Sequence, residues 1–206
     1  MTVTLKNKVL PVNHVFLGVI MVLLLSLSSP ADAEAEGTRL LREVQGPEQE
    51  IKNRNGLPLI ISKKVCNVGV SPESIMIDHG RLIRFTVFIV NLTDESFTFS
   101  LEDIRVSSGQ KDIDLVPAKR IMDEERKEYS RETLDISKDE AKILSPYVED
   151  KMQRLEKSLL KDQKISPRGM LEGLIAIELP AGSDSMAIEI TTPKDSHRFD
   201  FSVMEL

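Results

Sequence analysis

Two histidines are the side chains of this sequence best suited to acid–base chemistry at neutral pH. His79 follows Asp78, and His197 follows Asp195 and Ser196. A Ser/His/acid hydrolase needs a histidine that an acid orients and that reaches a nucleophile. Both histidines are expected in turns, and the alternation of strand direction places these turns at opposite ends of the fold. We therefore expect two solvated turn residues and neither a shared metal site nor a catalytic pair.

The sequence contains none of the common catalytic or cofactor motifs. It lacks a Gly-x-Ser-x-Gly elbow, a phosphate loop, a His-Glu-x-x-His pair and a dinucleotide fingerprint. Asp94, Glu95 and Asp195 could approach one another, but they lack the regular spacing of a calcium loop. A glycosidase would lack its usual stacking platforms, because there is no Trp and there are only two Tyr. We predict no catalytic, metal or cofactor residues, and an enzyme of unrecognised type stays open.

Composition excludes several further classes of protein. The chain has 206 residues with 27 Lys+Arg and 33 Asp+Glu, a formal charge of -6, which argues against a nucleic-acid binder. Its single cysteine, Cys66, can form neither an intrachain disulfide nor a multi-cysteine zinc site. Cys66 stands in the apolar segment Val65-Cys66-Asn67-Val68, so we interpret it as a buried small residue. Pairing with another chain through Cys66 is the alternative.

The first 33 residues have the order of a secretory signal peptide. Lys6 and Lys8 precede a mostly apolar run over 15–27, and a proline and the small residues Ala31 and Ala33 follow. This order predicts cleavage after Ala33 and a periplasmic or secreted protein. The run is shorter than the roughly 20 residues that cross a bilayer, so no stable membrane span is expected after cleavage. An uncleaved anchor in the inner membrane is the alternative.

The remaining sequence divides into a tether and one β domain. Residues 34–58 are rich in Glu, contain two prolines and show little apolar periodicity, which predicts a flexible tether. Over 59–206 apolar residues alternate with period 2, and polar turns separate the alternating segments. This pattern predicts a mainly β fold, an antiparallel β-sandwich of about seven strands. The alternating positions are Ile83, Phe85, Val87 and Ile89; Phe97, Phe99 and Leu101; Ile113 and Leu115; Ile175, Ile177 and Leu179; Met186, Ile188 and Ile190; and Phe199, Phe201 and Val203.

Residues 117–168, called the insert below, interrupt this pattern between the fourth and fifth predicted strands. Ser137-Lys138-Asp139-Glu140 is a capping-box pattern, and Ser145-Pro146 offers a second helix start. The insert predicts one amphipathic helix over about 146–161 and a second, highly charged helix over about 121–133. The apolar stripe of the first helix packs on the β domain, contacts a partner protein, or does both. It consists of Val148, Met152, Leu155 and Leu159.

Two segments of the β domain resemble exported bacterial immunoglobulin-like domains of uncharacterised function. One segment runs over 85–94 and continues into Phe97-Thr98-Phe99, as a strand, an asparagine, a polar turn and a second strand. The other runs over 167–177, with Pro167, Gly169 and Gly173 ahead of a strand. The resemblance implies an immunoglobulin-like fold, with the α-helical insertion between strands four and five, and export. It implies no reaction, because fold does not determine function.

The sequence therefore favours an exported, non-catalytic binding or assembly module of the cell envelope. We expect its partner to be another envelope or secreted protein, contacted at the helical end of the fold, where turns 91–96 and 193–197 are also expected. The candidate partner contacts are Val148, Met152, Leu155 and Leu159. The alternative is a carrier that holds a hydrophobic small molecule between helix and sheet.

Overall fold

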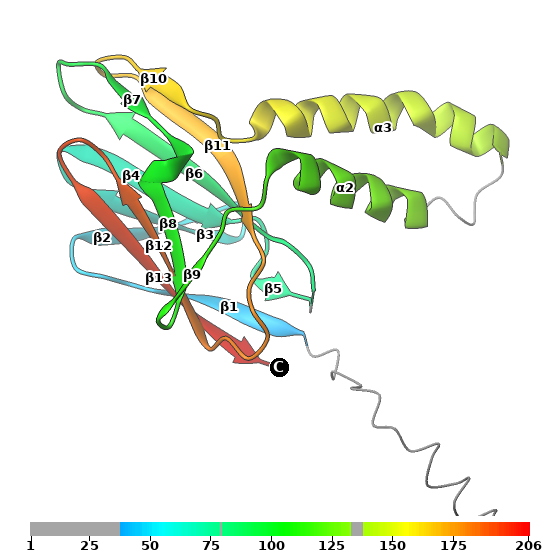
Figure 1. The fold of residues 1–206 in the computed structure, drawn as a ribbon, viewed down its shortest axis with the longest axis horizontal. Helices are drawn as coiled ribbons and strands as arrows, with labels where there is room; N and C mark the ends of the chain where they lie inside the picture. Colours follow the sequence, from blue (N-terminus) through cyan, green and yellow to red (C-terminus); the bar gives the residue numbers. More distant parts are fainter. Residues whose placement is uncertain (1–37, 79, 133–137) are drawn as a thin grey trace, which may run out of the picture. The chain divides into compact units, whose positions relative to one another are not determined.

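Antiparallel strands build most of the protein, whose computed structural model describes residues 38–78, 80–132 and 138–206. These residues belong to one compact unit, Gly37–Leu206, and Figure 1 shows its sheets and helices. The larger sheet has the order β5 (Met76–Ile77), β1 (Arg39–Val44), β13 (Ser196–Glu205), β12 (Ser185–Thr191), β8 (Ile104–Ser108) and β9 (Lys111–Ile113). The second has the order β11 (Met170–Ile177), β6 (Ile83–Asn91), β4 (Cys66–Pro72), β3 (Leu57–Lys63) and β2 (Gln49–Arg54). A small sheet pairs β10 (Gln163–Ile165) with β7 (Phe97–Phe99), and a 3-10 turn, η1 (Leu101–Asp103), follows β7.

A single apolar core joins the two large sheets. Buried residues alternate strictly with half-buried ones along β6, which lies between β11 and β4. Its inward side chains Ile83, Phe85, Val87 and Ile89 are at most 5% exposed. The ring of Phe85 lies 5.3 Å from that of Phe201 on β13, so the core is continuous from one sheet to the other. The alternation therefore predicted the inward face of this central strand correctly.

The strands are more numerous than the sequence pattern suggested. The described residues contain thirteen strands where about seven were expected. Two of the additional strands, β5 and β10, have two and three residues, too few for an alternating pattern to be recognised in the sequence. What the pattern predicted correctly is the coarser class: a mainly β protein with antiparallel sheets and two helices.

The predicted tether over 34–58 is largely folded. Residues 39–44 form β1, which pairs with β13 over its whole length and with β5 at its start. Residues 49–54 form β2, which pairs with β3 at the edge of the five-stranded sheet. Backbone hydrogen bonds hold both strands in their sheets. Backbone pairing does not depend on side-chain type, so a strand held in this way can lack the apolar alternation by which strands are recognised in a sequence. Residues 1–33, including the predicted cleavage residues Ala31 and Ala33, lie outside the described residues.

The insert folds as two helices that are longer than predicted. α2 spans Ala118–Glu132 and α3 spans Lys138–Ser158. Pro146, expected as the first helical residue, lies inside α3. Its missing N–H removes one backbone hydrogen bond, but the helix continues on both sides of it. Ser137, the first residue of the predicted capping box, lies outside the described residues.

Candidate functional site

The insert is attached to the edge strand β11 by two short segments, residues 114–117 and 159–161, called the stem below. Val116 N–H donates to the Ala176 carbonyl at 2.8 Å, and Leu160 N–H donates to the Leu174 carbonyl at 2.9 Å. Both segments thus pair with the free edge of the five-stranded sheet. This pairing covers backbone groups that would otherwise be exposed at a sheet edge.

Gly173 makes the close approach of the stem to β11 possible. A Cβ atom placed on Gly173 would lie 2.6 Å from Leu160 Cα, closer than non-bonded carbon atoms can approach. Any other residue at position 173 would therefore move the stem or the strand.

A second apolar cluster holds the base of the helical hairpin, α2 and α3, on the outer face of β11. It is separate from the main core. Its buried members are Val116, Ile121, Leu159, Leu174 and Ala176, and the half-buried Leu82, Met122 and Leu155 pack against it. The hairpin is therefore anchored at its base by apolar packing as well as by backbone pairing.

The predicted partner contacts, three on α3 and Leu159 just after it in the stem, differ in accessibility. Met152 is 4% exposed and Leu159 is 6% exposed, while Leu155 packs on the second cluster and Val148 is half-buried. Met152 and Leu159 are thus occupied within the chain and unavailable to a partner in this structure. The stripe has the packing role that was one of its two interpretations, because an amphipathic helix buries its apolar side first.

A buried carboxylate joins the hairpin to the sheet. Glu125 Oε2 on α2 accepts a hydrogen bond from Arg84 Nη2 on β6 at 2.7 Å, and Glu125 Oε1 lies 2.7 Å from Lys151 Nζ on α3. Burial alone would raise the pKa of Glu125, but the hydrogen bonds from Lys151 and Arg84 outweigh it and hold the pKa below its ordinary value. No local sequence pattern indicates this triad, because its three members come from distant parts of the chain.

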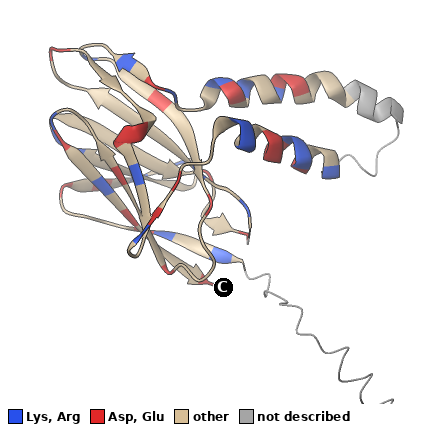
Figure 2. Cartoon of the chain, in the orientation of Figure 1, with Lys and Arg blue, Asp and Glu red and all other residues tan. Residues whose placement is uncertain are grey.

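Lys, Arg, Asp and Glu residues are distributed along α2 and the described part of α3 (Figure 2), and the hairpin projects away from the sheets (Figure 1). The exposed side of α3 carries Tyr147, which is 67% exposed, and an ion pair of 2.6 Å between Asp150 and Arg154. Positions 147, 150 and 154 fall on one side of a helix, because they are three and four residues apart. This surface, Tyr147 with Asp150 and Arg154, is called the α3 face below.

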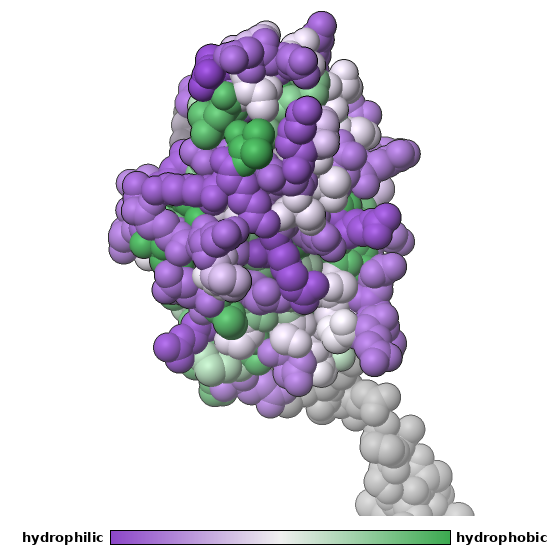
Figure 3. All heavy atoms as spheres, turned by 90° about the vertical axis from the view of Figure 1, so that its left-hand side faces the viewer, coloured by the Kyte–Doolittle hydropathy of each residue, from purple (hydrophilic) through white to green (hydrophobic). Residues whose placement is uncertain are grey.

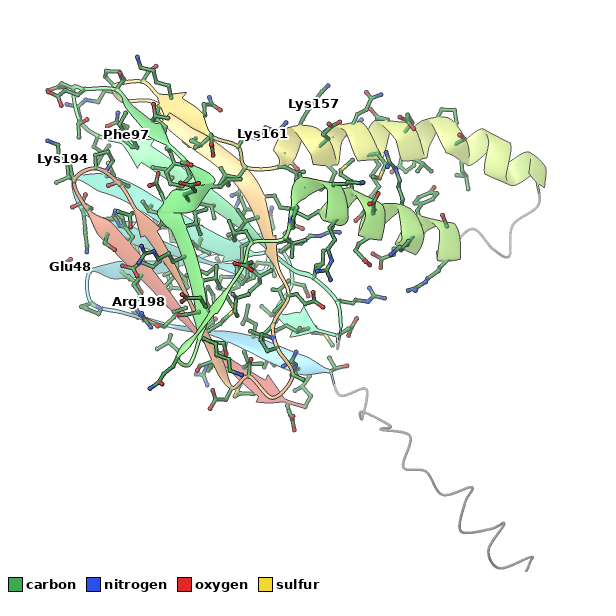
Figure 4. The ribbon with its side chains drawn as sticks, in the orientation of Figure 1. Glu48, Phe97, Lys157, Lys161, Lys194 and Arg198 are labelled. Atoms are coloured by element: carbon green, nitrogen blue, oxygen red, sulfur yellow. The ribbon has the colours of Figure 1, made fainter. Side chains whose placement is uncertain are left out.

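The turns expected beside the hairpin lie at another end of the molecule. Asn91 donates from Nδ2 to the Ser166 carbonyl, Asp94 pairs with Arg168 at 2.9 Å, and Asp195 accepts the Cys66 N–H at 2.9 Å. Figure 4 shows Lys194 at this end, far from Lys157 and Lys161 at the base of α3. The expectation that turns 91–96 and 193–197 gather with the inserted helices is therefore wrong, since α2 instead contacts Arg84 near the start of β6.

This turn end is mainly hydrophilic. Figure 3 faces it and shows hydrophilic residues over most of the surface, with smaller apolar patches between them. Val65, in the turn between β3 and β4, and Leu92, in the turn after β6, are exposed apolar residues, at 48% and 37%. No group of three or more His, Cys, Asp or Glu residues in the described part of the chain is arranged to hold a metal ion.

His197 is fully buried, which contradicts its prediction as a solvated turn residue. It lies on β13 with an exposure of 0%, and its Nδ1 is 2.9 Å from Ser62 Oγ. Its Nε2 lies 4.0 Å from Asp195 Oδ2 and has no hydrogen-bond partner. Burial lowers the pKa of His197, although the Asp195 carboxylate acts in the opposite direction. The period-2 pattern of the sequence could have indicated that His197 is buried, because His197 alternates with Phe199 and Phe201 on the inward face of β13.

Ser62, His197 and Asp195 have the residue types of a hydrolase triad, but their placement does not suit catalysis. Ser62 is 3% exposed, so its hydroxyl cannot reach a substrate. Cys66 is buried as predicted, at 1%, and is a free thiol. His79, the other histidine considered, lies outside the described residues.

Comparisons with known proteins add little to this description. No family model matches the chain, and no curated protein matches it. Among solved structures, the chain is similar to the yjhA protein from Bacillus subtilis, with 6% identity, a TM-score of 0.38 and coverage of 72% of this chain and 93% of that chain. None of the helices in the described residues is long and apolar enough to cross a membrane.

Proposed function

We propose that this protein is an exported, non-catalytic binding module of the bacterial cell envelope that contacts a partner protein through its helical hairpin. In this proposal the strands form an immunoglobulin-like scaffold, and the α3 face is the contact surface. The observation that carries the proposal is the projection of the hairpin: its base is packed on β11, and the α3 face stays exposed. Rigid elements that project from a β scaffold are suited to binding.

The chemistry of the α3 face supports a protein partner. Tyrosine offers a large contact area at a low cost in side-chain entropy, and tyrosine and arginine are among the residues most enriched where binding energy concentrates. Tyr147 is 67% exposed, and Arg154 and Asp150 are 78% and 52% exposed. The ion pair is exposed, so exchanging it for contacts with a partner costs little.

The export part of the proposal rests on the sequence of residues 1–33. Cleavage after Ala33 would remove no described strand, because β1 begins at Arg39. The mature protein in the periplasmic or secreted fraction should therefore have Glu34 as its first residue. An intact N-terminus in the membrane fraction would instead show an uncleaved anchor.

Site-specific photo-cross-linking in the native cells tests the contact surface. A photoreactive residue at position 147 or 154 should give the same discrete adduct, and one at Gln110, in the exposed turn between β8 and β9, should not. Arg154→Glu should abolish the adduct formed from position 147, while the protein level stays unchanged. Identical adducts from all three positions, or none from 147 and 154, would refute the proposed surface.

A further inference from the structure

A cavity of about 680 Å³ lies beside the stem, between the edges of the two large sheets. One wall comes from β8 and β9, and the opposite wall comes from β11. β9 and β11 are the edge strands of their sheets, so the cavity is the opening between two sheet edges. Residues 159–160 and the first turn of α2 close it toward the hairpin.

The walls of this cavity are apolar and its rim is charged. Aliphatic side chains from both walls and from the stem line it, among them Ile104 and Val106 on β8, Leu160 in the stem and Ile175 on β11. Glu102, Arg105, Asp112 and Asp114 line the rim and are exposed. Within the described residues, none of these four side chains forms an ion pair.

We propose that this cavity binds a small amphiphile with an apolar body and a cationic head group. The volume lies in the range of about 300–1,000 Å³ that is typical of small-molecule sites. The apolar body would lie against the buried aliphatic side chains between the sheets. The head group would lie at the rim, beside the carboxylates of Asp112 and Asp114. This site is separate from the α3 face and goes beyond the proposed protein contact.

The charges at the rim decide the sign of the head group. The rim has three carboxylates, on Glu102, Asp112 and Asp114, and one guanidinium, on Arg105. Its net charge is therefore two negative charges. Pro117 and Ala118, at the start of α2, also line the cavity, and a helix N-terminus contributes about half a positive charge. The carboxylates outweigh this contribution, so a cation is attracted and an anion repelled.

Binding of three decyl-chain probes to the purified protein, each below its micelle-forming concentration, tests the proposal. Isothermal titration calorimetry should rank decyltrimethylammonium above decyl maltoside, and decyl maltoside above decyl sulfate. We expect about a tenfold difference between the cation and the anion that shrinks as salt is added, because exposed charges are screened. Equal or tighter binding of decyl sulfate would overturn the proposal, as would the absence of binding of the cation.

Two variants test the place of binding. Asp112→Asn with Asp114→Asn should remove most of the preference for the cation, while decyl maltoside binds as before. Ala118→Trp should weaken all three probes at least tenfold, because Ala118 lines the cavity mouth and is exposed. Ala181→Trp, in a distant exposed turn, is the matched control and should bind normally. If Ala118→Trp fails to fold, the Asp112→Asn and Asp114→Asn double variant still tests the place of binding. An unchanged preference for the cation in this variant would refute a head-group site at the rim.

Discussion

Arg54 and Glu172 form an ion pair of 3.0 Å, although they lie on the two opposite edge strands of the five-stranded sheet. The residue directly across the sheet from Glu172 is Glu50, four positions before Arg54. In a flat sheet the two backbones would be roughly 23 Å apart, at about 4.8 Å per strand and 3.3 Å per residue. The accumulated right-handed twist brings these diagonal corners together over the outer face of the sheet.

The twist, and not this ion pair, should hold the corners in place. Both side chains are exposed, at 47% and 39%. We predict a coupling free energy below about 1 kcal/mol in a double-mutant cycle of Arg54→Ala and Glu172→Ala, measured by chemical denaturation. The coupling should fall further at 1 M salt. A coupling above about 2 kcal/mol would show that the pair itself bends the sheet.

His197 should make the protein less stable in mild acid. Its pKa is lowered in the folded state, so the unfolded state binds more protons once the pH falls below about 6.5, the ordinary value. The free energy of unfolding should be constant above this pH and decrease below it. Urea denaturation at several pH values between 7.5 and 5.0 measures the change.

The chain contains three histidines, so the source of this acid sensitivity needs a control. His197→Gln should lower stability at neutral pH and remove the decrease between pH 6.5 and 5.0. His79→Gln should keep that decrease. The opposite result would assign the effect to His79.

Burial on α3 and at its junction with the stem should separate residues that stabilise the hairpin from residues that contact a partner. Leu159→Ala removes buried methyl groups from the second cluster and should cost about 2–4 kcal/mol. Tyr147→Ala should change stability by less than about 0.5 kcal/mol, because the side chain is exposed. Thermal denaturation compares the two. A large loss of stability in Tyr147→Ala would mean that the α3 face serves the fold.

Glu125 should contribute stability that disappears in acid. Its pKa lies below the ordinary value of about 4.5, so its contribution is complete above that pH and is lost as the pH falls below it. Glu125→Ala leaves Arg84, whose side chain is 21% exposed, without its partner and should cost about 2–3 kcal/mol at pH 7. Glu128→Ala, which removes the exposed pair with Arg81, should cost under about 1 kcal/mol. Equal losses in the two variants would refute the role of the buried triad.

Gly173→Ala should loosen the stem. The added methyl group would meet the Leu160 backbone, and overpacking of this kind costs about 1–3 kcal/mol. We expect faster hydrogen exchange at the Leu160 amide and through α2 and α3, with little change in β12 and β13. Glu172→Ala, at the neighbouring exposed position, is the control. Uniformly faster exchange in all strands would contradict local loosening.

Local patterns were enough to predict the class of the fold and its most regular elements. The inward face of β6 follows from the alternation of Ile83, Phe85, Val87 and Ile89, and the burial of Met152 on α3 and of Leu159 directly after it fits the amphipathic spacing of the predicted helix. Both patterns are local, because a strand repeats every two residues and a helix about every 3.6 residues. The same alternation places His197 inward with Phe199, although its turn-like surroundings in the sequence favoured the opposite interpretation.

The sequence alone determined a mainly β protein with antiparallel strands and a helical insert. Only the tertiary structure decided where that insert attaches, which residues it leaves exposed, and which distant side chains meet. β1 and β2 are held by backbone pairing with strands far away in the chain, so no local apolar pattern announces them. Likewise, Arg84 meets Glu125, and Arg54 meets Glu172, only because sheet twist and stem pairing bring separate segments together. Such contacts depend on the arrangement of whole elements, which residue periodicity does not encode.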